Sequence, residues 1–479
     1  MSAAVRPSAS GRFHIVSVGW NSQMITGILD AVESATNITF SHLITSEPDV
    51  TNESGREGHG PFIRVRERAD IELPAIDHEL LRSLEGPGIP TIHNMITGDT
   101  ILRALPHDEA LAFATFLARR LRELFEQLKP SVVLGGFDRL HAGLGLAVAR
   151  QMGIPWVAMF FTTIPTGFVS FCTSTTPEQV LPFDPPPEPV LRALVEKTLR
   201  DFEAKSIIVP AYISSGSLSL VLKRLPRHLR LFWGALKRTL VGGFDRYTEL
   251  PAWRLALQYL RKRRNAIRLP LDWFVQKPPT TPYIFFGLHM RPESTVDIWA
   301  PFYTNQFYVL EILARAMPPS HQLLVKLHKS DSDNYSRAEL KALRRLPGLK
   351  LVSPFVQSRD FIEHASIVAS IQGTMAFEAA LLAKPVLVFG ASKTLDMPGV
   401  KRAMEPSMLP AQIRELLEES RPTREEILRG FMTYLAPCSP GCYADWEAMP
   451  TPAEVADLAR LFERLRDFYS KSAAAGLPA

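Results

Sequence analysis

Three polar stretches in the second half of the chain each follow a segment that is expected to form a strand. They are His289-Met-Arg-Pro-Glu293, Lys326-Leu-His328-Lys329 and Gln372-Gly-Thr-Met-Ala-Phe-Glu378. In a doubly wound parallel sheet, ligands bind beyond the carboxyl ends of the strands. Cations and a glycine turn at that edge are suited to a phosphorylated ligand. We therefore expect an anion-binding site in this half of the chain.

Lys326 and His328 are two residues apart, so in a strand they lie on the same face. A cation and an imidazole at a strand end can hold a phosphate linkage and balance the charge on a departing nucleotide. His328 is for this reason a candidate catalytic residue as well as a ligand contact. The alternative is a strand end that is merely solvated.

The third stretch combines a glycine turn with the start of a helix. Gly373 permits a tight turn, and a helix that begins at Thr374 offers backbone N–H groups to an anion, with Gln372 beside it. Glu378 follows one turn later, where a carboxylate can bind the two hydroxyls of a ribose. The alternative is that Glu378 only complements the helix dipole.

His289, Arg291 and Glu293 form a loop with two basic residues and an acid, which indicates contacts to a donor or its sugar. The alternative is an ordinary surface loop.

The first half of the chain offers candidates for an acceptor site and, in Asp138 and His141, for catalytic residues. Asp138 and His141 follow an expected strand, and Asp138 could deprotonate an acceptor hydroxyl, with Arg139 beside it. The alternative is that Asp138 caps the next helix. Trp20 and Asn21, after the first strand, could stack on a sugar and hydrogen-bond to it, although a buried tryptophan is the plainer interpretation.

Alternating strands and helices must position these residues. Apolar patterning predicts βαβ units in both halves, and right-handed crossovers then give parallel sheets. Proline clusters at 182–189 and 278–282 mark two boundaries. We predict an α/β protein with two Rossmann-type lobes, divided into an acceptor lobe (1–181), a helical basic insertion (182–278), a nucleotide-sugar lobe (279–409) and C-terminal helices (410–479).

The three polar stretches, in this order, resemble the capsular polysaccharide biosynthesis family; the resemblance covers residues 282–390 well and the first lobe loosely. It implies the two-lobed GT-B glycosyltransferase fold and a kinship with transferases that use CMP-activated Kdo. It also implies that Lys326 and His328 contact the donor phosphate, that Gly373 and Thr374 cradle it, and that Glu378 holds the ribose. The family has proline where this chain has Lys329, which bears on the identity of the donor.

Composition limits the class of protein. With 479 residues, 46% hydrophobic and 22% charged, the chain can bury large cores. Cys172, Cys438 and Cys442 are too few for a disulfide framework, and reduced thiols fit a cytoplasmic enzyme. Cys438 and Cys442 have no second Cys/His pair spaced to complete a metal site. Asp331 and Asp333 offer an alternative, since paired aspartates can hold Mn²⁺, but they lie in a polar loop, and a two-lobed enzyme can neutralise its leaving group with a lysine and a helix terminus. No metal and no cofactor is therefore expected.

One segment makes the chain basic. Residues 221–268 hold 13 Lys or Arg against two acids, a net charge of +11, whereas the remainder holds 41 against 47, a net charge of −6. With its aromatic residues, this segment suits peripheral contact with an anionic inner-membrane surface, where lipid-linked acceptors would lie. No nucleic-acid motif accompanies the charges, so no nucleic-acid partner is expected. A solvated helical insertion is the alternative.

The sequence thus predicts a metal-independent glycosyltransferase that moves a sugar from a CMP- or UDP-linked donor to a polysaccharide or lipid-linked glycan. A sugar-nucleotide epimerase of the same fold and a catalytically silent polysaccharide-binding subunit are the competing interpretations.

Overall fold

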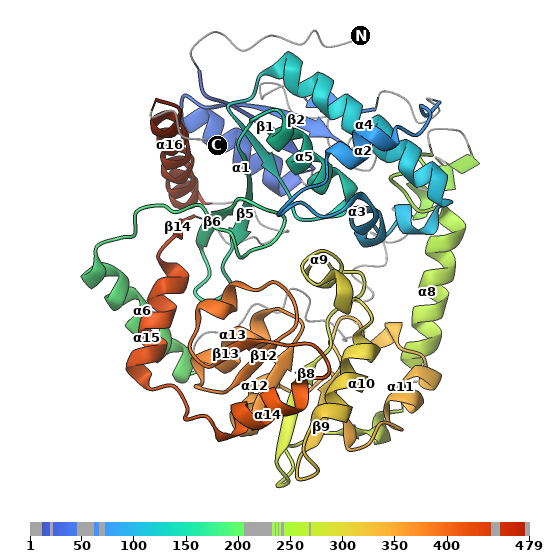
Figure 1. Cartoon of the computed structure of the whole chain (residues 1–479), viewed down its shortest axis with the longest axis vertical. Coiled ribbons are helices and arrows are strands. Elements are labelled where there is room, and N and C mark those ends of the chain that lie inside the picture. The colour runs from blue at the N-terminus through green and yellow to red at the C-terminus, as the bar shows by residue number, and fades with distance from the viewer. Residues whose placement is uncertain are drawn as a thin grey trace. The chain divides into compact units, whose positions relative to one another are not determined.

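The computed structural model describes residues 12–19, 23–45, 62–66, 72–205, 232–234, 236–237, 239–240, 244–267, 270–441 and 451–474 (Figure 1). Its contacts divide the chain into two compact units. The first unit comprises residues 1–185, 237–251 and 437–479, and the second comprises residues 186–236 and 252–436.

The first unit is built on a seven-stranded sheet in the order β14-β6-β5-β4-β1-β2-β3. The strands are β1 (His14–Val18), β2 (Thr39–Ile44), β3 (Phe62–Arg64), β4 (Val132–Gly135), β5 (Trp156–Phe161), β6 (Phe168–Cys172) and β14 (Ser439–Pro440). The first five run parallel, whereas β6 pairs antiparallel with both β5 and β14 at one edge. The helices are α1 (Gln23–Ala35), α2 (His78–Ser83), α3 (Ile92–Gly98), α4 (His107–Leu128), α5 (Arg139–Gln151) and α16 (Pro452–Ala474).

The second unit is built on seven parallel strands in the order β13-β12-β11-β8-β9-β10-β7. They are β7 (Phe274–Val275), β8 (Tyr283–Gly287), β9 (Gln322–Lys326), β10 (Leu349–Val352), β11 (Ile367–Ser370), β12 (Val386–Val388) and β13 (Val400–Arg402). The helices are α6 (Glu188–Glu203), α8 (Ala252–Ile267), α9 (Ser294–Asp297), α10 (Gln306–Ala316), α11 (Arg337–Leu343), α12 (Ser358–His364), α13 (Thr374–Leu381), α14 (Leu409–Glu418) and α15 (Arg424–Leu435).

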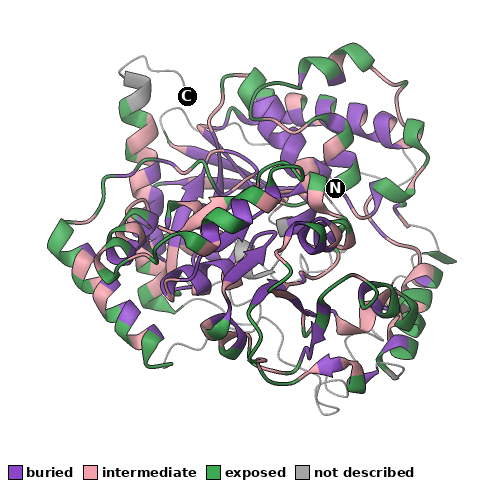
Figure 2. Ribbon diagram, turned by 60° about the horizontal axis from the view of Figure 1, so that its bottom comes forward, coloured by how far each residue is buried: buried purple, intermediate pink, exposed green. Residues whose placement is uncertain are grey.

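Both sheets confirm the predicted doubly wound α/β architecture. Their central strands are nearly continuous apolar runs, as in β8, because a parallel sheet is covered on both faces. Figure 2 shows the strands buried and the outward faces of many helices exposed. In each sheet the strand order reverses at the centre, between β1 and β4 in the first and between β8 and β11 in the second. The loops that follow these strand pairs form the crevices where ligands bind in such folds.

The compact units divide the chain differently from the four expected segments. Helix α16 belongs to the first unit, where Phe462 is fully buried and packs edge-on against Phe40 and Phe171, at 5.6 and 5.4 Å between ring centroids. Helices α14 and α15, from the same expected C-terminal segment, stay with the second sheet. Helical periodicity shows that a helix has an apolar face, but it does not show which sheet receives that face.

Candidate functional site

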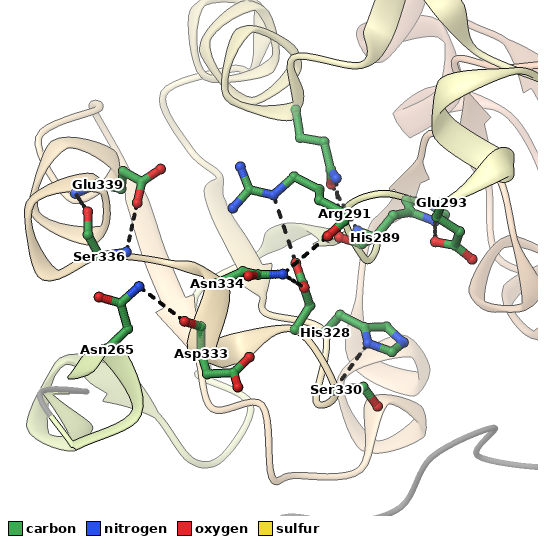
Figure 3. A network of polar contacts seen from close by, with 12 residues as sticks. Asn265, His289, Arg291, Glu293, His328, Ser330, Asp333, Asn334, Ser336 and Glu339 are labelled. Carbon is green, nitrogen blue, oxygen red and sulfur yellow. Dashed lines mark hydrogen bonds and ion pairs between the residues drawn. The ribbon is translucent and has the colours of Figure 1, made fainter. Parts of the chain in front are cut away.

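His289 lies with Arg291 and Glu293 on the loop after β8, in a network of polar contacts (Figure 3). Its imidazole reaches the loop after β11. Its Nε2 atom accepts the backbone N–H of Gln372 at 3.3 Å and lies 3.3 Å from Ser370 Oγ. Because Nε2 is an acceptor, the proton of the neutral ring is on Nδ1, 3.6 Å from Glu293 Oε2. Three of the predicted residues are therefore joined at the switch point of the second sheet.

Gly373 makes the turn that the ring covers. Its φ is +108°, a region that favours glycine, and a Cβ atom there would lie 3.1 Å from His289 Cε1. Helix α13 begins at the next residue, and its first turn has neither a side-chain cap nor an acidic residue. Its N-terminal N–H groups can therefore serve an anion.

Gln372 adds an unmet hydrogen-bonding group to the same loop. The side chain is 7% exposed, and among the residues that the structure describes none hydrogen-bonds to its Oε1 atom. A buried amide oxygen without a partner is costly. A ligand that donates a hydrogen bond here would remove that cost.

Lys326 and His328 stand at the carboxyl end of β9, as predicted. Lys326 is 9% exposed and donates to the carbonyl of Pro354 at 3.4 Å. Burial, helped by Lys329, lowers its pKa to about 8. His328 Nδ1 accepts the N–H of Ser330 at 3.2 Å, so the neutral ring carries its proton on Nε2. Burial also lowers the pKa of His328, which makes it a neutral hydrogen-bond donor at physiological pH.

Glu378 lies in the second turn of α13, and burial perturbs its pKa as it does that of Lys326. Burial raises the pKa of its carboxyl to about 7, against the opposing effect of the cations Arg359 and Lys326. Lys326 and Glu378 thus each stabilise the charged form of the other. Perturbed titrating groups gathered at a switch point are typical of functional sites.

Arg291 joins a neighbouring cluster. Its guanidinium lies over the ring of Tyr335 at 4.2 Å, and its Nε atom is 3.8 Å from Asp331 Oδ2. Asp331 is 2% exposed, and burial raises its pKa to about 6. Asn334 donates to the Arg291 carbonyl at 3.2 Å and also to Asp331. In this arrangement Arg291 anchors the end of the His289 loop.

Within the described residues, no group of three or more His, Cys, Asp or Glu side chains is arranged to hold a metal ion. Cys442 lies outside these residues.

The switch point of the first sheet has a matching glycine–histidine contact. Gly19, after β1, has a φ of +80°, and a Cβ atom there would lie 2.2 Å from Nε2 of His141. Burial, and secondly the nearby Arg139, lowers the pKa of His141 to about 3, so its ring is neutral. Trp20 and Asn21 lie outside the described residues.

Asp138 occupies the N-cap position of α5, but its exposed side chain makes no capping hydrogen bond. The buried carboxylate of Asp99 instead accepts the N–H of Leu140 at 3.2 Å. The expected capping role therefore falls to Asp99, and Asp138 is left facing solvent. Arg139 and His141 line a pocket together with Asp99.

Sequence reasoning missed Asp99 and also Gln306, which hydrogen-bonds to the backbone of His289. Neither residue directly follows a strand: Asp99 comes just after the end of α3, and Gln306 is the first residue of α10. A polar residue at a helix end was the one available signal, and it applies to many positions.

The raised pKa of Glu378 predicts a pH-dependent stability. Between the ordinary value of 4.5 and about 7, the unfolded chain loses this proton and the folded chain keeps it. The free energy of unfolding therefore falls as the pH rises through this window. We expect Glu378→Gln to remove that part of the slope and to melt at a higher temperature than the unaltered chain at pH 7.5, with little difference near pH 4.

Thermal melts from pH 4 to 8 measure this effect, and Glu405→Gln, at an exposed glutamate of the same unit, is the control. Parallel slopes for Glu378→Gln and the unaltered chain would show that burying this carboxyl is not destabilising.

No protein-family model matches the chain, and no curated protein matches it. Solved structures with a similar arrangement include the glycotransferase of kitacinnamycin, with 16% identity, 96% of this chain and 99% of that chain covered, and a TM-score of 0.29. The UDP-GlcNAc 2-epimerase from Neisseria meningitidis shows 12% identity, coverage of 95% and 99%, and a TM-score of 0.30. The Thermosulfurimonas dismutans KpsC beta Kdo 2,7 transferase shows 12% identity, coverage of 72% and 90%, and a TM-score of 0.31. At these scores the fold class rests on the strand order of the chain's own two sheets.

Proposed function

We propose that the chain is a glycosyltransferase that moves a sugar from a CMP- or UDP-linked donor to a growing capsular or surface polysaccharide, or to a glycolipid. The observation that carries this proposal is the set of groups at the switch point of the second sheet. A buried lysine, two imidazoles, a glycine turn and an uncapped helix N-terminus meet there. Together these groups can bind the phosphate of a nucleoside monophosphate or diphosphate.

Each group has a role in donor binding. The N-terminus of α13 and Lys326 hold the phosphate, and His328 donates its Nε2 proton to a phosphate oxygen. Glu378 accepts hydrogen bonds from the ribose hydroxyls, and Gln372 Oε1 accepts one from the base or sugar. When the glycosidic bond breaks, the cation and the helix terminus stabilise the departing phosphate. The proposed reaction therefore proceeds without a metal.

The proposal assigns the acceptor to the first unit. Asp138 takes the proton from the attacking hydroxyl, because it is exposed while the His141 ring is packed against Gly19. Arg139, Trp20 and Asn21 are the proposed acceptor contacts.

An epimerase remains the competing function because one observation favours it. His289, His328, Glu293 and Glu378 supply acid and base groups within the second unit alone. Incubation of the sugar nucleotide without acceptor distinguishes the two functions, since only an epimerase would change the stereochemistry of the donor in its NMR spectrum. A silent binding subunit would bind the nucleotide and turn nothing over.

The donor site predicts that one nucleotide among CMP, UDP, GDP and dTDP stabilises the chain in a thermal-shift screen. At a hundredfold excess over its Kd, such a ligand adds about 2.7 kcal/mol to the free energy of unfolding. We expect His328→Ala to weaken its binding about tenfold, because a hydrogen bond to a charged group is lost.

His321→Ala is the matched control, since this histidine immediately precedes the opposite end of the same strand, β9. Titration calorimetry should show unchanged affinity in that variant. Equal affinities in both variants would remove His328 from the site.

The acceptor assignment predicts that Asp138→Asn lowers turnover about a hundredfold or more, the usual contribution of a general base. The affinity for the nucleotide should stay unchanged, because the base acts on the acceptor. Asp108→Asn, at an exposed aspartate in the first turn of α4, is the control. Wild-type turnover in Asp138→Asn would make its carboxylate dispensable.

We further propose a cytoplasmic location with peripheral attachment to an anionic inner membrane. Trp253, Leu257 and Leu260 recur at i, i+4 and i+7 along α8 and are 58%, 57% and 62% exposed. The opposite side of the helix is held in the second unit, where buried Asn265 donates to the carbonyl of Asp333 at 3.1 Å. No helix in the described part of the chain has the length and apolarity to cross a bilayer.

Charge favours lipid over another protein as the partner of this face. Helix α8 carries five cations and no acid, and Arg254 and Arg263 lie over the rings of Trp253 and Tyr259. An apolar stripe flanked by arginines is typical of a helix that lies in the membrane interface. The cations add about 1 kcal/mol each near an anionic surface.

We expect the chain to co-sediment with anionic liposomes at low salt and to dissociate as salt rises. Replacing Arg261, Arg263 and Arg264 by Gln should weaken binding. The double change Leu257→Ser with Leu260→Ser should also weaken binding, and its effect should not depend on the salt concentration. Exposed Arg315, Arg429 and Arg460, changed to Gln together, keep the same net charge as the first variant and serve as its control. Equal binding to neutral and anionic vesicles would remove the role of the α8 cations, and binding to neither would reduce α8 to a solvated helix.

A further inference from the structure

The hydrogen-bond ladder between β8 and β9 ends just before His289. Its last bond runs from the N–H of Leu288 to the carbonyl of Lys326, at 2.9 Å. The next residue is bonded by a side chain instead. Gln306 Oε1 accepts the N–H of His289 at 2.9 Å, and Gln306 Nε2 donates to the carbonyl of His289 at 3.2 Å. One amide thus bonds both backbone groups of the residue, as an antiparallel strand partner would.

Gln306 is itself firmly held. It is 2% exposed and is the first residue of α10, after Asn305, whose side chain accepts the N–H of Tyr308 at 3.3 Å. Its own N–H donates to the carbonyl of Thr304 at 3.0 Å. The amide therefore projects from a capped helix start and cannot turn without leaving both of its bonds unmet.

The backbone of His289 decides where its ring points. Beyond the end of a strand, φ and ψ are no longer fixed by a ladder, and a small rotation would carry the imidazole away from Gln372 and Gly373. The two bonds from Gln306 fix the peptide groups on either side of the His289 Cα atom. This keeps the ring over the glycine turn and holds the Gln372 N–H in place.

We infer that Gln306 is a positioning residue for the nucleotide phosphate site, acting through His289, an inference that rests on the proposed donor site. It fixes the imidazole in one orientation and one tautomer, with Nε2 toward the Gln372 N–H. The turn that precedes α13 is thereby arranged before the ligand arrives. Preorganisation of this kind contributes affinity because the ordering cost is met during folding.

The chain provides a matched control. Gln412 is 3% exposed and makes a comparable contact at the end of β13, where it accepts the N–H of Met404 at 3.0 Å and donates to the carbonyl of Arg402, the last residue of the strand, at 2.7 Å. β13 is an edge strand of the same sheet, and β12 and β11 separate it from β8. Gln306→Met and Gln412→Met therefore remove equivalent buried amides at two places.

The experiment uses the full chain and two measurements. Titration calorimetry with CMP and UDP gives the affinity, and selective ¹⁵N labelling of histidine, assigned with His289→Gln, gives the tautomer of His289. We expect Gln306→Met to weaken nucleotide binding about tenfold, because the hydrogen bonds that position His289 are lost. The ¹⁵N signals of the His289 ring should then be an average over its two tautomers. Gln412→Met should lower the melting temperature to a similar extent and change neither measurement.

Three results would overturn the inference. The first is wild-type affinity and a wild-type His289 tautomer in folded Gln306→Met. The second is an equal loss of affinity in Gln306→Met and Gln412→Met, and the third is a loss of affinity in Gln306→Met with an unchanged His289 tautomer. If Gln306→Met does not fold, Gln306→Glu keeps the acceptor for the His289 N–H but lacks the donor, and wild-type values for it would count equally against the inference. Failure of the unaltered chain to bind either nucleotide would refute the proposed CMP- or UDP-linked donor. The tautomer of His289 in Gln306→Met would still test whether Gln306 positions its ring.

Discussion

The contact between the His289 ring and the Gly373 turn depends on one topological constraint, the reversal of strand order between β8 and β11. Neighbouring parallel strands whose following helices lie on opposite faces leave a crevice between their loops. Here a side chain from one loop covers the turn of the other, and a Cβ atom at Gly373 would press on it. The positions of Gln372, of the α13 N-terminus and of Glu378 all follow from that packing.

The same packing determines the electrostatics of the site. Burial lowers the pKa of Lys326 to about 8 and raises that of Glu378 to about 7, so both groups titrate close to neutral pH. Each would be more stable in water, and the fold holds them out of it. In the proposed donor site, a bound phosphate and bound hydroxyls would supply the partners that desolvation has removed, so that binding would recover part of the stability that burial costs.

Both units pack a histidine ring against a glycine turn, but the glycine and the histidine occur in opposite order along the chain. In the first, Gly19 follows β1 and His141 lies beyond β4; in the second, His289 follows β8 and Gly373 lies beyond β11. Each glycine has a positive φ, and a Cβ atom would lie 2.2 Å from the His141 ring at Gly19 and 3.1 Å from the His289 ring at Gly373. The surroundings differ, however. Burial, and secondly Arg139, lowers the pKa of His141 to about 3, whereas His289 faces the carboxylate of Glu293.

The sequence alone determined the parallel strands of the two sheets and the three polar stretches of the second unit, because strand patterning and the position of a residue after a strand are local properties. It did not indicate the antiparallel edge formed by β6 and β14 in the first sheet. Only the tertiary structure decided that Gln306 bonds to His289, 17 residues away, and that Asp99 serves the start of α5, 41 residues from Leu140. It also decided that Arg291 contacts Asp331 and Tyr335, and that α16 belongs to the unit of the first sheet. A lone amide, a lone carboxylate or an apolar helix face has many possible partners in a sequence, and the packing of distant segments selects one of them.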